Sequence, residues 1–466
     1  MAKKPLGKDK FGAQKSMRFP DYFCDSLGQF GLNTISGLSG QLMYFYTEKI
    51  GLAATTVATL FFITKIIDAF TDLAMAKVID MTPKGKERYR PWLLKAGIPG
   101  AVLIALMFMV PDTVPAVQLA YMFITNILLT AVFYTAICIP FNALLVVSTE
   151  SQEERGNMGT WRAAAGYVSG MVIVMTIIPV TNMLGGTQSA WIKYGVVFAA
   201  ILILCFLICY LRSRESTERN VVKTPEQIEA EAENVPFGEA LKMLFKNKYW
   251  VMVLIAALAS QVTYGLANNS GTYYAKYIYG NDNLVGLLGA VGMIPTLLGF
   301  LLVTPMIKKL GVTNTLRVAF TMGAVATALR LINPYHFWYN TILGCFSSFA
   351  NIPMMCLMGV LTAMSIDYNE YKYGKRLIAY SQSASGFGGK VGNGIGSSIV
   401  GWLLGVAGYD TMVTLTEPVK QAIFGFNIYL PLALWIIMMV ISFMFDLEPR
   451  LPAMRKEIAE RKANAK

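Results

Sequence analysis

Apolar residues occur along this chain in long runs that short polar segments separate. A helix that crosses a lipid bilayer needs about 20 consecutive, mostly apolar residues. Twelve runs fit this template, and they fall at residues 27–47, 55–79, 92–110, 116–147, 163–182, 191–212, 249–278, 283–306, 318–334, 337–364, 378–407 and 423–445. The pattern predicts an all-α membrane protein of twelve transmembrane helices, several of them long enough to be tilted.

The longest polar stretch, residues 213–248, divides the predicted helices into two sets of six. We therefore expect a first half at 1–212, a middle loop at 213–248, a second half at 249–445 and a C-terminal tail at 446–466. Within the loop, residues 237–247 have apolar side chains at helical spacing and basic residues at the end. Two interpretations stay open for this segment, a short helix along the membrane surface and a solvated linker.

The composition agrees with a membrane protein. Hydrophobic residues make up 55% of the chain and charged residues only 15%, whereas soluble domains carry roughly 25% charged residues. Much of the surface must therefore face lipid. The polar, basic N-terminal segment has no apolar core followed by a cleavage site, so we do not expect a signal peptide.

The net charge of +12 arises from Lys and Arg residues that gather in alternate loops and in both tails. In the N-terminal half these cations are Lys3, Lys4, Lys8, Lys10, Lys15, Arg18, Lys84, Lys86, Arg88 and Arg90. Cytoplasmic loops of membrane proteins carry such an excess. We expect both termini in the cytoplasm, a location in the plasma (cell inner) membrane and no nucleic-acid partner.

Cysteine and histidine usage gives no support to an enzyme. The six cysteines form no CxxC pair, and His336 is the only histidine. We expect no disulfide, no structural metal and no cofactor. Two six-helix halves joined by a cytoplasmic loop instead predict a major-facilitator-type carrier, in which the halves rock about a site near the middle of the bilayer.

Ionisable residues inside apolar runs are the best functional candidates, because each costs about 2.5–3.5 kcal/mol at a helix centre. Asp68 and Asp72 are four residues apart in the second run, so they share one helix face. Two carboxylates this close favour a bound cation, or a proton on one of them. A static ion pair, for example with Lys65, is the alternative.

Three further residues fit a polar site inside the membrane. Thr135 offers a hydroxyl to a cation, and the nearby Pro140 either frees a backbone carbonyl for a site or makes an ordinary kink. Arg162, at the start of the fifth run, either snorkels to the surface or donates a bidentate fork to a polar ligand. Lys390, in the glycine-rich eleventh run, needs an acidic partner, and the acidic pair of the second run is the expected one.

Neutral amides suit hydroxyl-rich ligands, because they both donate and accept hydrogen bonds. Asn33 lies in the first run, and Asn268 and Asn269 lie in the seventh, before Tyr273 and Tyr274. We expect the amides to bind a polar solute and the rings to pack on a sugar. The alternative role of an Asn in a membrane helix is to join two helices.

The segments that hold these residues resemble a known family, the glycoside–pentoside–hexuronide cation symporters. The similar segments are LGQFGLN, YFYTEKIGL, KIIDAFTDLAMAKVID, KGKERYRPW, YTAICIPFNAL, WRAAAGY, SIDYNEYKYGKR and GKVGNGIG. The resemblance covers about residues 20–445. It implies a major facilitator fold and cation-coupled transport of a sugar or glycoside.

The resemblance also implies roles for single residues. Asp68 and Asp72 match the acidic pair that binds the coupling cation, and Thr135 matches a hydroxyl at the same site. Arg162 matches an arginine that contacts the sugar, and Lys390 matches a lysine close to both sites.

This chain departs from the melibiose permease, the best-known member of that family, at four positions. Leu32 and Asn33 replace a lysine and a sugar-binding aspartate, and Asn142 replaces a sugar-stacking tryptophan. Cys138 replaces an aspartate that cation and sugar share, so a sodium ligand is missing. We therefore expect a solute other than melibiose, contacts from Asn33 and Asn142, and H⁺ or Na⁺ as the coupling ion.

The leading prediction is symport of a small sugar or glycoside by a monomer in the lipid bilayer. The alternative is a carrier of the same fold that moves a lysolipid or an organic anion.

Overall fold

The computed structural model describes residues 7, 14–81, 87–149, 151–215, 237–374, 377–409 and 415–464. Most of the predicted middle loop therefore lies outside the described residues, as do the loop and tail cations Lys3, Lys4, Lys8, Lys10, Lys84 and Lys86.

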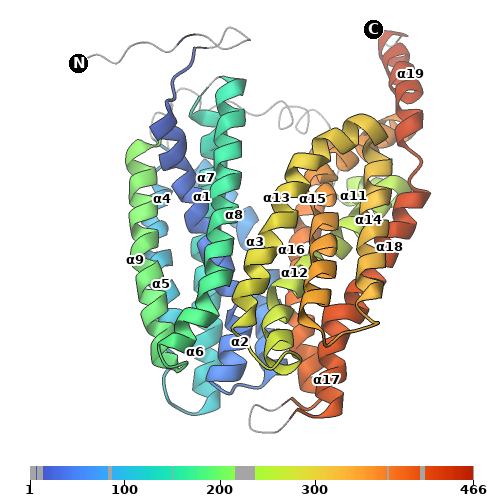
Figure 1. The fold of residues 1–466 in the computed structure, drawn as a ribbon. Helices are drawn as coiled ribbons and strands as arrows, with labels where there is room; N and C mark the ends of the chain where they lie inside the picture. Colours follow the sequence, from blue (N-terminus) through green and yellow to red (C-terminus); the bar gives the residue numbers. More distant parts are fainter. Residues whose placement is uncertain are drawn as a thin grey trace. The chain divides into compact units, whose positions relative to one another are not determined.

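The described residues pack into two compact units, and each is considered by itself (Figure 1). The first unit comprises the described parts of residues 1–222, 283–289 and 409–414. The second unit comprises the remaining described residues from 237 onward. The boundaries predicted at 212 and 248 stay predictions, because residues 216–236 are not described.

The first unit is built of long helices, three of which are interrupted. They are α1 (Phe19–Gly40), α2 (Leu42–Tyr44) with the π-helix η1 (Phe45–Lys49), α3 (Ala54–Asp80), α4 (Trp92–Lys95), α5 (Gly97–Phe108), α6 (Pro115–Ile127), the π-helix η2 (Leu128–Tyr134), α7 (Thr135–Val147), α8 (Gln152–Met183) and α9 (Gln188–Arg212). Its core near η1 is aromatic, where Phe45, Phe108 and Trp191 lie ring against ring.

The second unit is also helical. Its elements are α11 (Phe237–Lys246), α12 (Lys248–Tyr277), α13 (Leu284–Leu310, from Ala290 onward), α14 (Val312–Leu329), α15 (Phe337–Tyr373), α16 (Ile378–Val406), α17 (Glu417–Phe424), the π-helix η4 (Gly425–Tyr429), α18 (Leu430–Met444), the 3₁₀ turn η5 (Glu448–Arg450) and α19 (Leu451–Asn464). A core of buried side chains from α12, α14, α15 and α18 includes Tyr249, Phe320 and Trp435.

Every predicted apolar run coincides with one helix or with consecutive helices, which confirms the all-α prediction. Eight described stretches are long and apolar enough to cross a membrane: Ala54–Asp72, Pro115–Leu145, Glu154–Met183, Gln188–Arg212, Lys248–Tyr277, Leu284–Leu310, Phe337–Tyr373 and Glu417–Met454. The pair α4 and α5 forms a shorter apolar stretch, and α1, α14 and α16 carry more polar residues and glycines. The arrangement is consistent with twelve spans.

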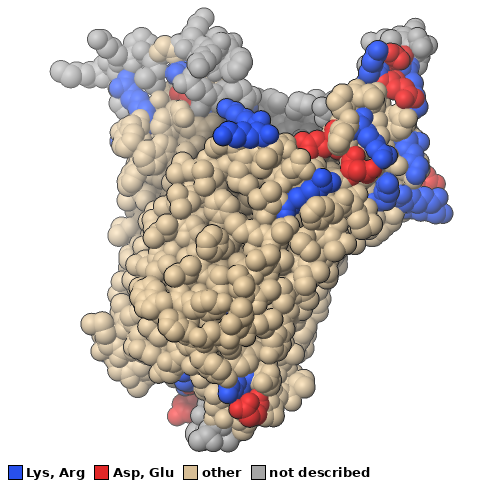
Figure 2. All heavy atoms as spheres, turned by 45° about the vertical axis from the view of Figure 1, so that its right-hand side comes forward, with Lys and Arg blue, Asp and Glu red and all other residues tan. Residues whose placement is uncertain are grey.

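Charged side chains gather near the top and the bottom of the face that Figure 2 shows. They leave a broad band of other side chains between them. Large apolar side chains such as Leu301 (71% exposed) and Phe443 (59% exposed) lie on the surface of the second unit. A bilayer provides the apolar surroundings that such a band requires.

Two helices begin eight or more residues earlier than their apolar runs predicted. α1 starts at Phe19 rather than at 27, because Pro20 suits a first turn and the Asp21 carboxylate accepts the Arg18 backbone N–H at 2.9 Å. α8 starts at Gln152 rather than at 163, because the Ser151 hydroxyl caps it by accepting the Glu154 N–H. A search for apolar runs does not detect polar first turns. Residues that the apolar runs placed at or before the start of a helix therefore lie inside it.

Residues 237–246 form the helix α11, so the interpretation of this segment as a solvated linker is wrong. Ala240 and Leu244 on this helix are fully buried and pack with Trp250 and Leu377. Phe245 is 56% exposed and contacts the Trp250 ring edge to face. One face of α11 therefore docks on its own unit.

In each unit, a glutamate just after the sixth predicted span binds the backbone at the start of the third predicted span. The sixth spans end with α9 and α18, and the third spans begin with α4 and α14. In the first unit, Glu215 accepts the backbone N–H groups of Arg88, Tyr89 and Arg90 at 2.6–3.2 Å. In return, the Arg90 guanidinium donates from Nε to the carbonyl of Tyr210 at 2.9 Å and lies over its ring.

The second unit repeats this contact with other residues. Glu448 accepts the N–H groups of Val312 and Thr313 at 2.8 and 2.7 Å. Arg317 donates from Nε to the Ser442 carbonyl at 3.0 Å and lies near the Phe443 ring. We call each of these arrangements a glutamate clamp. The two clamps reveal a structural repeat that is not visible in the sequence.

Candidate cation and solute sites

Two carboxylates and one hydroxyl meet inside the first unit. Asp68 and Asp72 lie one turn apart on α3, and Thr135 lies at the start of α7. The Thr135 Oγ1 atom is 3.1 Å from Asp68 Oδ1 and 3.0 Å from Asp72 Oδ1. Its single proton can be donated to only one carboxylate at a time. Asp68 and Thr135 are buried, at 4% and 2% exposure.

The backbone around Thr135 explains why its hydroxyl reaches α3. The seven residues of the π-helix η2 end at Tyr134, directly before Thr135. A π-helical turn inserts an extra residue, so it rotates the following side chains relative to a regular helix, and such turns are frequent at functional sites. Five residues later Pro140 has no N–H to donate, which leaves one main-chain carbonyl of α7 without its helical partner.

Cys138 lies on α7 three residues after Thr135, and its side chain is partly exposed. The Asn142 amide contacts its sulfur at 3.5 Å, and Asn142 itself is exposed. A thiol is a soft ligand, whereas Na⁺ prefers oxygen ligands as other hard cations do. The side-chain oxygens in this cluster that can bind a hard cation are therefore those of Asp68, Asp72 and Thr135.

A second polar group lies where α1 packs against α8. Arg162 donates from Nε and Nη2 to the two carboxylate oxygens of Asp25, at 2.6 and 2.8 Å. Its Nη1 donates to the Phe141 carbonyl at 2.9 Å, and the guanidinium lies 3.7 Å from the centre of the Phe141 ring. Asp25 and Arg162 are 3% and 5% exposed. Arg162 is ten residues inside α8, so it neither ends a helix nor snorkels.

The same face of α1 continues with amides. Asp25, Gln29 and Asn33 are spaced by four residues and so share a helix face. The Gln29 amide donates to Asn33 Oδ1 at 2.7 Å. A Cβ atom on Gly166 of α8 would lie 2.8 Å from Asn33 Nδ2, so the glycine makes room for this amide. We call Asp25, Gln29, Asn33 and Arg162 the α1–α8 polar stripe.

Hydroxyl groups extend the same interface. Thr34 and Ser169 lie 2.7 Å apart through their Oγ atoms, and the Ser169 hydroxyl also donates to the Phe30 carbonyl. Both residues are fully buried. This pair joins the two helices and leaves the amides of the stripe as the groups with hydrogen-bonding capacity to spare.

The predicted residues of the second half lie in the second unit. Asn268 is exposed on α12, whereas Asn269 is buried and donates to the Gly265 carbonyl at 2.9 Å. Lys390 is partly exposed on α16. Its pairing with the acidic residues of α3 stays a prediction.

Tyr273 and Tyr274 are not available to stack on a sugar, contrary to the sequence-based expectation. Their exposure is 0% and 2%, and their rings pack against Phe426 and Phe424 respectively. The Tyr274 hydroxyl donates to the Pro334 carbonyl at 2.7 Å. These rings stabilise the packing of α12 against the helices around it.

Sequence reasoning missed Asp25 and Gln29. The search for apolar runs began the first helix at residue 27, which left Asp25 in the tail. The signal that could have found them is the spacing of Asp25, Gln29 and Asn33 at i, i+4 and i+8, which marks one face of a helix.

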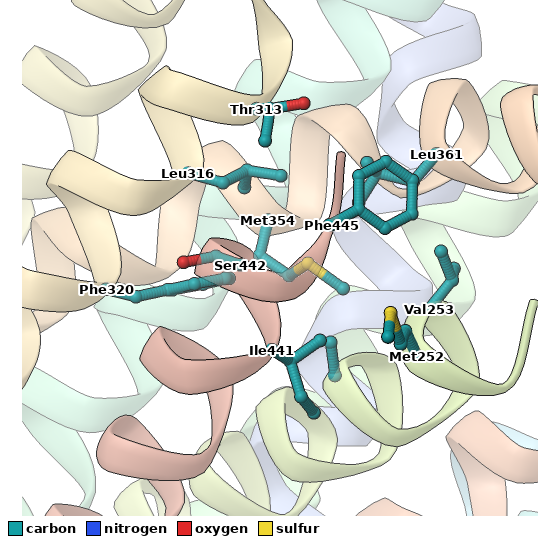
Figure 3. A pocket seen from close by; sticks show the side chains of 11 residues that line it. Met252, Val253, Thr313, Leu316, Phe320, Met354, Leu361, Ile441, Ser442 and Phe445 are labelled. Carbon is teal, nitrogen blue, oxygen red and sulfur yellow. The ribbon is translucent and has the colours of Figure 1, made fainter. Parts of the chain in front are cut away.

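A small cavity lies in the second unit among α12, α14, α15 and α18 (Figure 3). Its lining is apolar apart from Thr313 and Ser442, and it includes Met252, Phe320 and Phe445. The space is about 20 Å³, which is room for about one water molecule. It is too small and too apolar for a sugar.

Comparison with known sequences decides the family. The sequence model of the family described as MFS/sugar transport protein matches residues 26–449. The chain belongs to this family. It is thus a multi-pass membrane transport protein and not an enzyme, and its major facilitator fold agrees with the sequence-based prediction.

Relatives that match this chain over most of its length are named as transporters, symporters or carriers. The isoprimeverose transporter of Lactiplantibacillus pentosus is 28% identical over 398 residues, which cover 83% of this chain and 80% of that protein. The putative glycoside/cation symporter YagG of Escherichia coli is 25% identical and covers 81% and 80%. The glucuronide carrier protein homolog of Escherichia coli is 24% identical and covers 82% of each chain. These relatives confirm the resemblance to glycoside and cation symporters.

Solved structures agree on the fold. A bacterial homolog of the human lysosomal transporter Spinster superposes with a TM-score of 0.62 at 13% identity, over 95% of this chain and 98% of the other. The nucleoside transporter NupG gives 0.62 at 12% identity, over 94% and 100%. At these identities the similarity concerns the fold alone.

Proposed function

We propose that this member of the sugar transport family is a symporter that moves a sugar or glycoside together with H⁺ or Na⁺ by alternating access. The coupling ion binds at Asp68, Asp72 and Thr135. The observation that supports this most directly is the meeting of two carboxylates from α3 with a hydroxyl from α7 in a buried place.

Electrostatics explains why this cluster takes up a cation. Two carboxylates one helical turn apart repel each other, and a low-dielectric environment strengthens the repulsion. A cation or proton between them removes the repulsion and frees the Thr135 hydroxyl to act as a ligand or donor. The cluster therefore has two states, and the ion selects one of them.

The solute binds along the α1–α8 polar stripe. Gln29, Asn33 and the exposed Asn142 provide amide donors and acceptors for hydroxyl groups, and Arg162 lies at the end of the stripe. Asn268 and Lys390 of the second half of the chain are further candidates for solute binding, on the basis of the sequence alone. A stripe of amides and one ion pair favours a hydroxylated solute over a lysolipid.

Ion and solute assist each other's binding. By thermodynamic linkage, an ion that strengthens solute binding is itself bound more tightly when solute is present, and such coupling is typically about 1–3 kcal/mol. The protein works as a monomer, with both termini in the cytoplasm, as the distribution of basic loops suggests.

Uptake into proteoliposomes tests the proposal. Purified protein would be given an inward Na⁺ gradient, an inward H⁺ gradient or no gradient, with a panel of radiolabelled sugars and glycosides. We expect accumulation of at least one solute under one gradient, and loss of that accumulation in Asp72→Asn. Equal equilibration with and without gradients, or wild-type accumulation by Asp72→Asn, would contradict it.

A further inference from the structure

The Asp25 and Arg162 pair bears on the charge of the solute. Relatives of this chain bear names of both kinds, since isoprimeverose is an uncharged sugar and a glucuronide carries a carboxylate. A free arginine fork is the usual partner of a carboxylate ligand. The state of Arg162 is therefore informative about which kind of solute this chain accepts.

We infer that this chain transports an uncharged sugar or glycoside and rejects the corresponding uronate, because Asp25 occupies the arginine fork that an anionic solute would need. This inference rests on the proposed function, in which Arg162 lies at the solute site.

The donor nitrogens of the Arg162 guanidinium are already engaged, so little hydrogen-bonding capacity is left to bind an anion. Its Nε and Nη2 atoms donate to the two oxygens of Asp25 at 2.6 and 2.8 Å, which is a bidentate carboxylate contact already made. The third donor, Nη1, binds the Phe141 carbonyl, and the Phe141 ring covers one face of the guanidinium. A solute carboxylate would have to displace Asp25 from a buried pair.

Displacing Asp25 is unfavourable for two reasons. Asp25 is 3% exposed, so its carboxylate would lose its partner without gaining water. A second carboxylate beside it would also add like-charge repulsion in a place of low dielectric. An uncharged hydroxyl group meets neither obstacle and can bind the amides of Gln29 and Asn33.

The remaining members of the stripe carry no charge. Gln29 and Asn33 hydrogen-bond to each other. Asn142, which lies on α7 and outside the stripe, is also a neutral amide. Amides match hydroxyl groups, which donate and accept. Within the described residues of the stripe, Arg162 is the only cation, and it is neutralised within the protein.

Matched pairs of solutes test the inference in proteoliposomes. Glucose and glucuronate, galactose and galacturonate, and the methyl β-glucoside and methyl β-glucuronide each differ by a hydroxymethyl group against a carboxylate. We expect wild-type protein under the coupling gradient to accumulate the neutral member at least tenfold over its uronate. Preferred accumulation of a uronate would overturn the inference while leaving symport intact. If no member of any pair accumulated, the proposed function itself would fail.

A variant of Asp25 tests the stated cause. Asp25→Asn releases the fork of Arg162, and we expect the ratio of uronate to neutral uptake to rise at least tenfold. Asp25→Glu keeps a carboxylate and is expected to keep the neutral preference. If the folded Asp25→Asn protein shows an unchanged ratio, the pair does not set the preference and the inference is wrong.

Should Asp25→Asn fail to fold, the double variant Asp25→Asn with Arg162→Gln removes both charges and leaves no unpaired charge. Competition by the two members of each pair against a neutral tracer then gives the preference. We expect the double variant to bind neutral solutes more weakly than wild type but still to prefer them over the uronates. Tight uronate binding without Arg162 would show that another group recognises the anion, which would also contradict the inference.

Discussion

Thr135 and Asp72 are 63 residues apart in the sequence, yet the Thr135 hydroxyl lies 3.0 Å from Asp72 Oδ1. Hydrogen bonds to charged groups contribute about 1.5–3 kcal/mol, and 1.4 kcal/mol corresponds to a factor of about ten in affinity. We therefore expect Thr135→Ala to weaken the apparent affinity for the coupling ion about tenfold. Ion-dependent uptake or ion-induced thermal shifts would measure it. Thr135→Ser keeps the hydroxyl and should restore most of the affinity; equal behaviour of the two variants would argue against a ligand role.

The two carboxylates of α3 should be more sensitive than the hydroxyl. Neutral amides at these positions cannot carry the charge that attracts the ion, so Asp68→Asn and Asp72→Asn should each reduce gradient-driven accumulation more than about tenfold. Solute exchange without a gradient should persist better than accumulation. Asp112→Asn, at an exposed position outside the helices, provides the matched control. A comparable loss in that control would point to a general effect of charge rather than to a site.

A substitution at Gly166 on α8 tests the proposed contact of Asn33 with the solute. A methyl group there would come within 2.8 Å of Asn33 Nδ2 and 3.3 Å of Gln29 Cγ. Flexible side-chain ends can move, so Gly166→Ala should fold and yet bind solute about fivefold more weakly, since about 1 kcal/mol of hydrogen bonding is disturbed. Solute-induced thermal shifts would report the affinity.

Gly170 provides the control on the same helix. A Cβ atom there meets nothing within 4 Å. Replacing glycine by alanine inside a helix favours folding by about 0.5–1 kcal/mol, so Gly170→Ala should keep solute affinity and hold or raise the melting temperature. Weaker solute binding in both variants would show that the packing of α8, and not Asn33, is what matters.

The glutamate clamp of the second unit should contribute to stability. Removal of the Glu448 carboxylate leaves the Val312 and Thr313 N–H groups without their charged acceptor, so we expect Glu448→Ala to lower the free energy of unfolding by about 1.5–3 kcal/mol. Thermal denaturation in detergent would show a lower melting temperature. Glu460, whose side chain is 61% exposed in a pair with Lys456, is the control, because exposed pairs contribute only about 0–1 kcal/mol. Equal melting temperatures for Glu448→Ala and Glu460→Ala would contradict the role of the clamp.

What the sequence could predict depended on how local the feature is. The apolar runs identified the helices, and the spacing of Asp68 and Asp72 placed both on one face, because each follows from neighbouring residues. The polar first turns of α1 and α8 were missed, since they depend on capping by the Asp21 carboxylate and the Ser151 hydroxyl and not on hydropathy. Asp25 was missed for the same reason, because it lies in the part of α1 before residue 27.

Contacts between helices were beyond the sequence. The ion pair of Asp25 and Arg162 joins residues that are 137 positions apart in the sequence. No pattern along either helix predicts that these two residues pair. The exposure of the tyrosines was also misjudged, because Tyr273 and Tyr274 could serve either as packing or as a platform until their neighbours were known. The proximity of Thr135 to α3 was implied by a family resemblance alone.

The two glutamate clamps also constrain the order of events during synthesis. Glu215 leaves the ribosome 125 residues after Arg90, and Glu448 follows Thr313 by 135 residues. Each clamp can therefore close only when the sixth helix of its own half has been delivered to the bilayer, and neither waits for the other half. Because protein domains generally fold as units while the chain is being made, the first half can be locked while the translocon is still receiving the second.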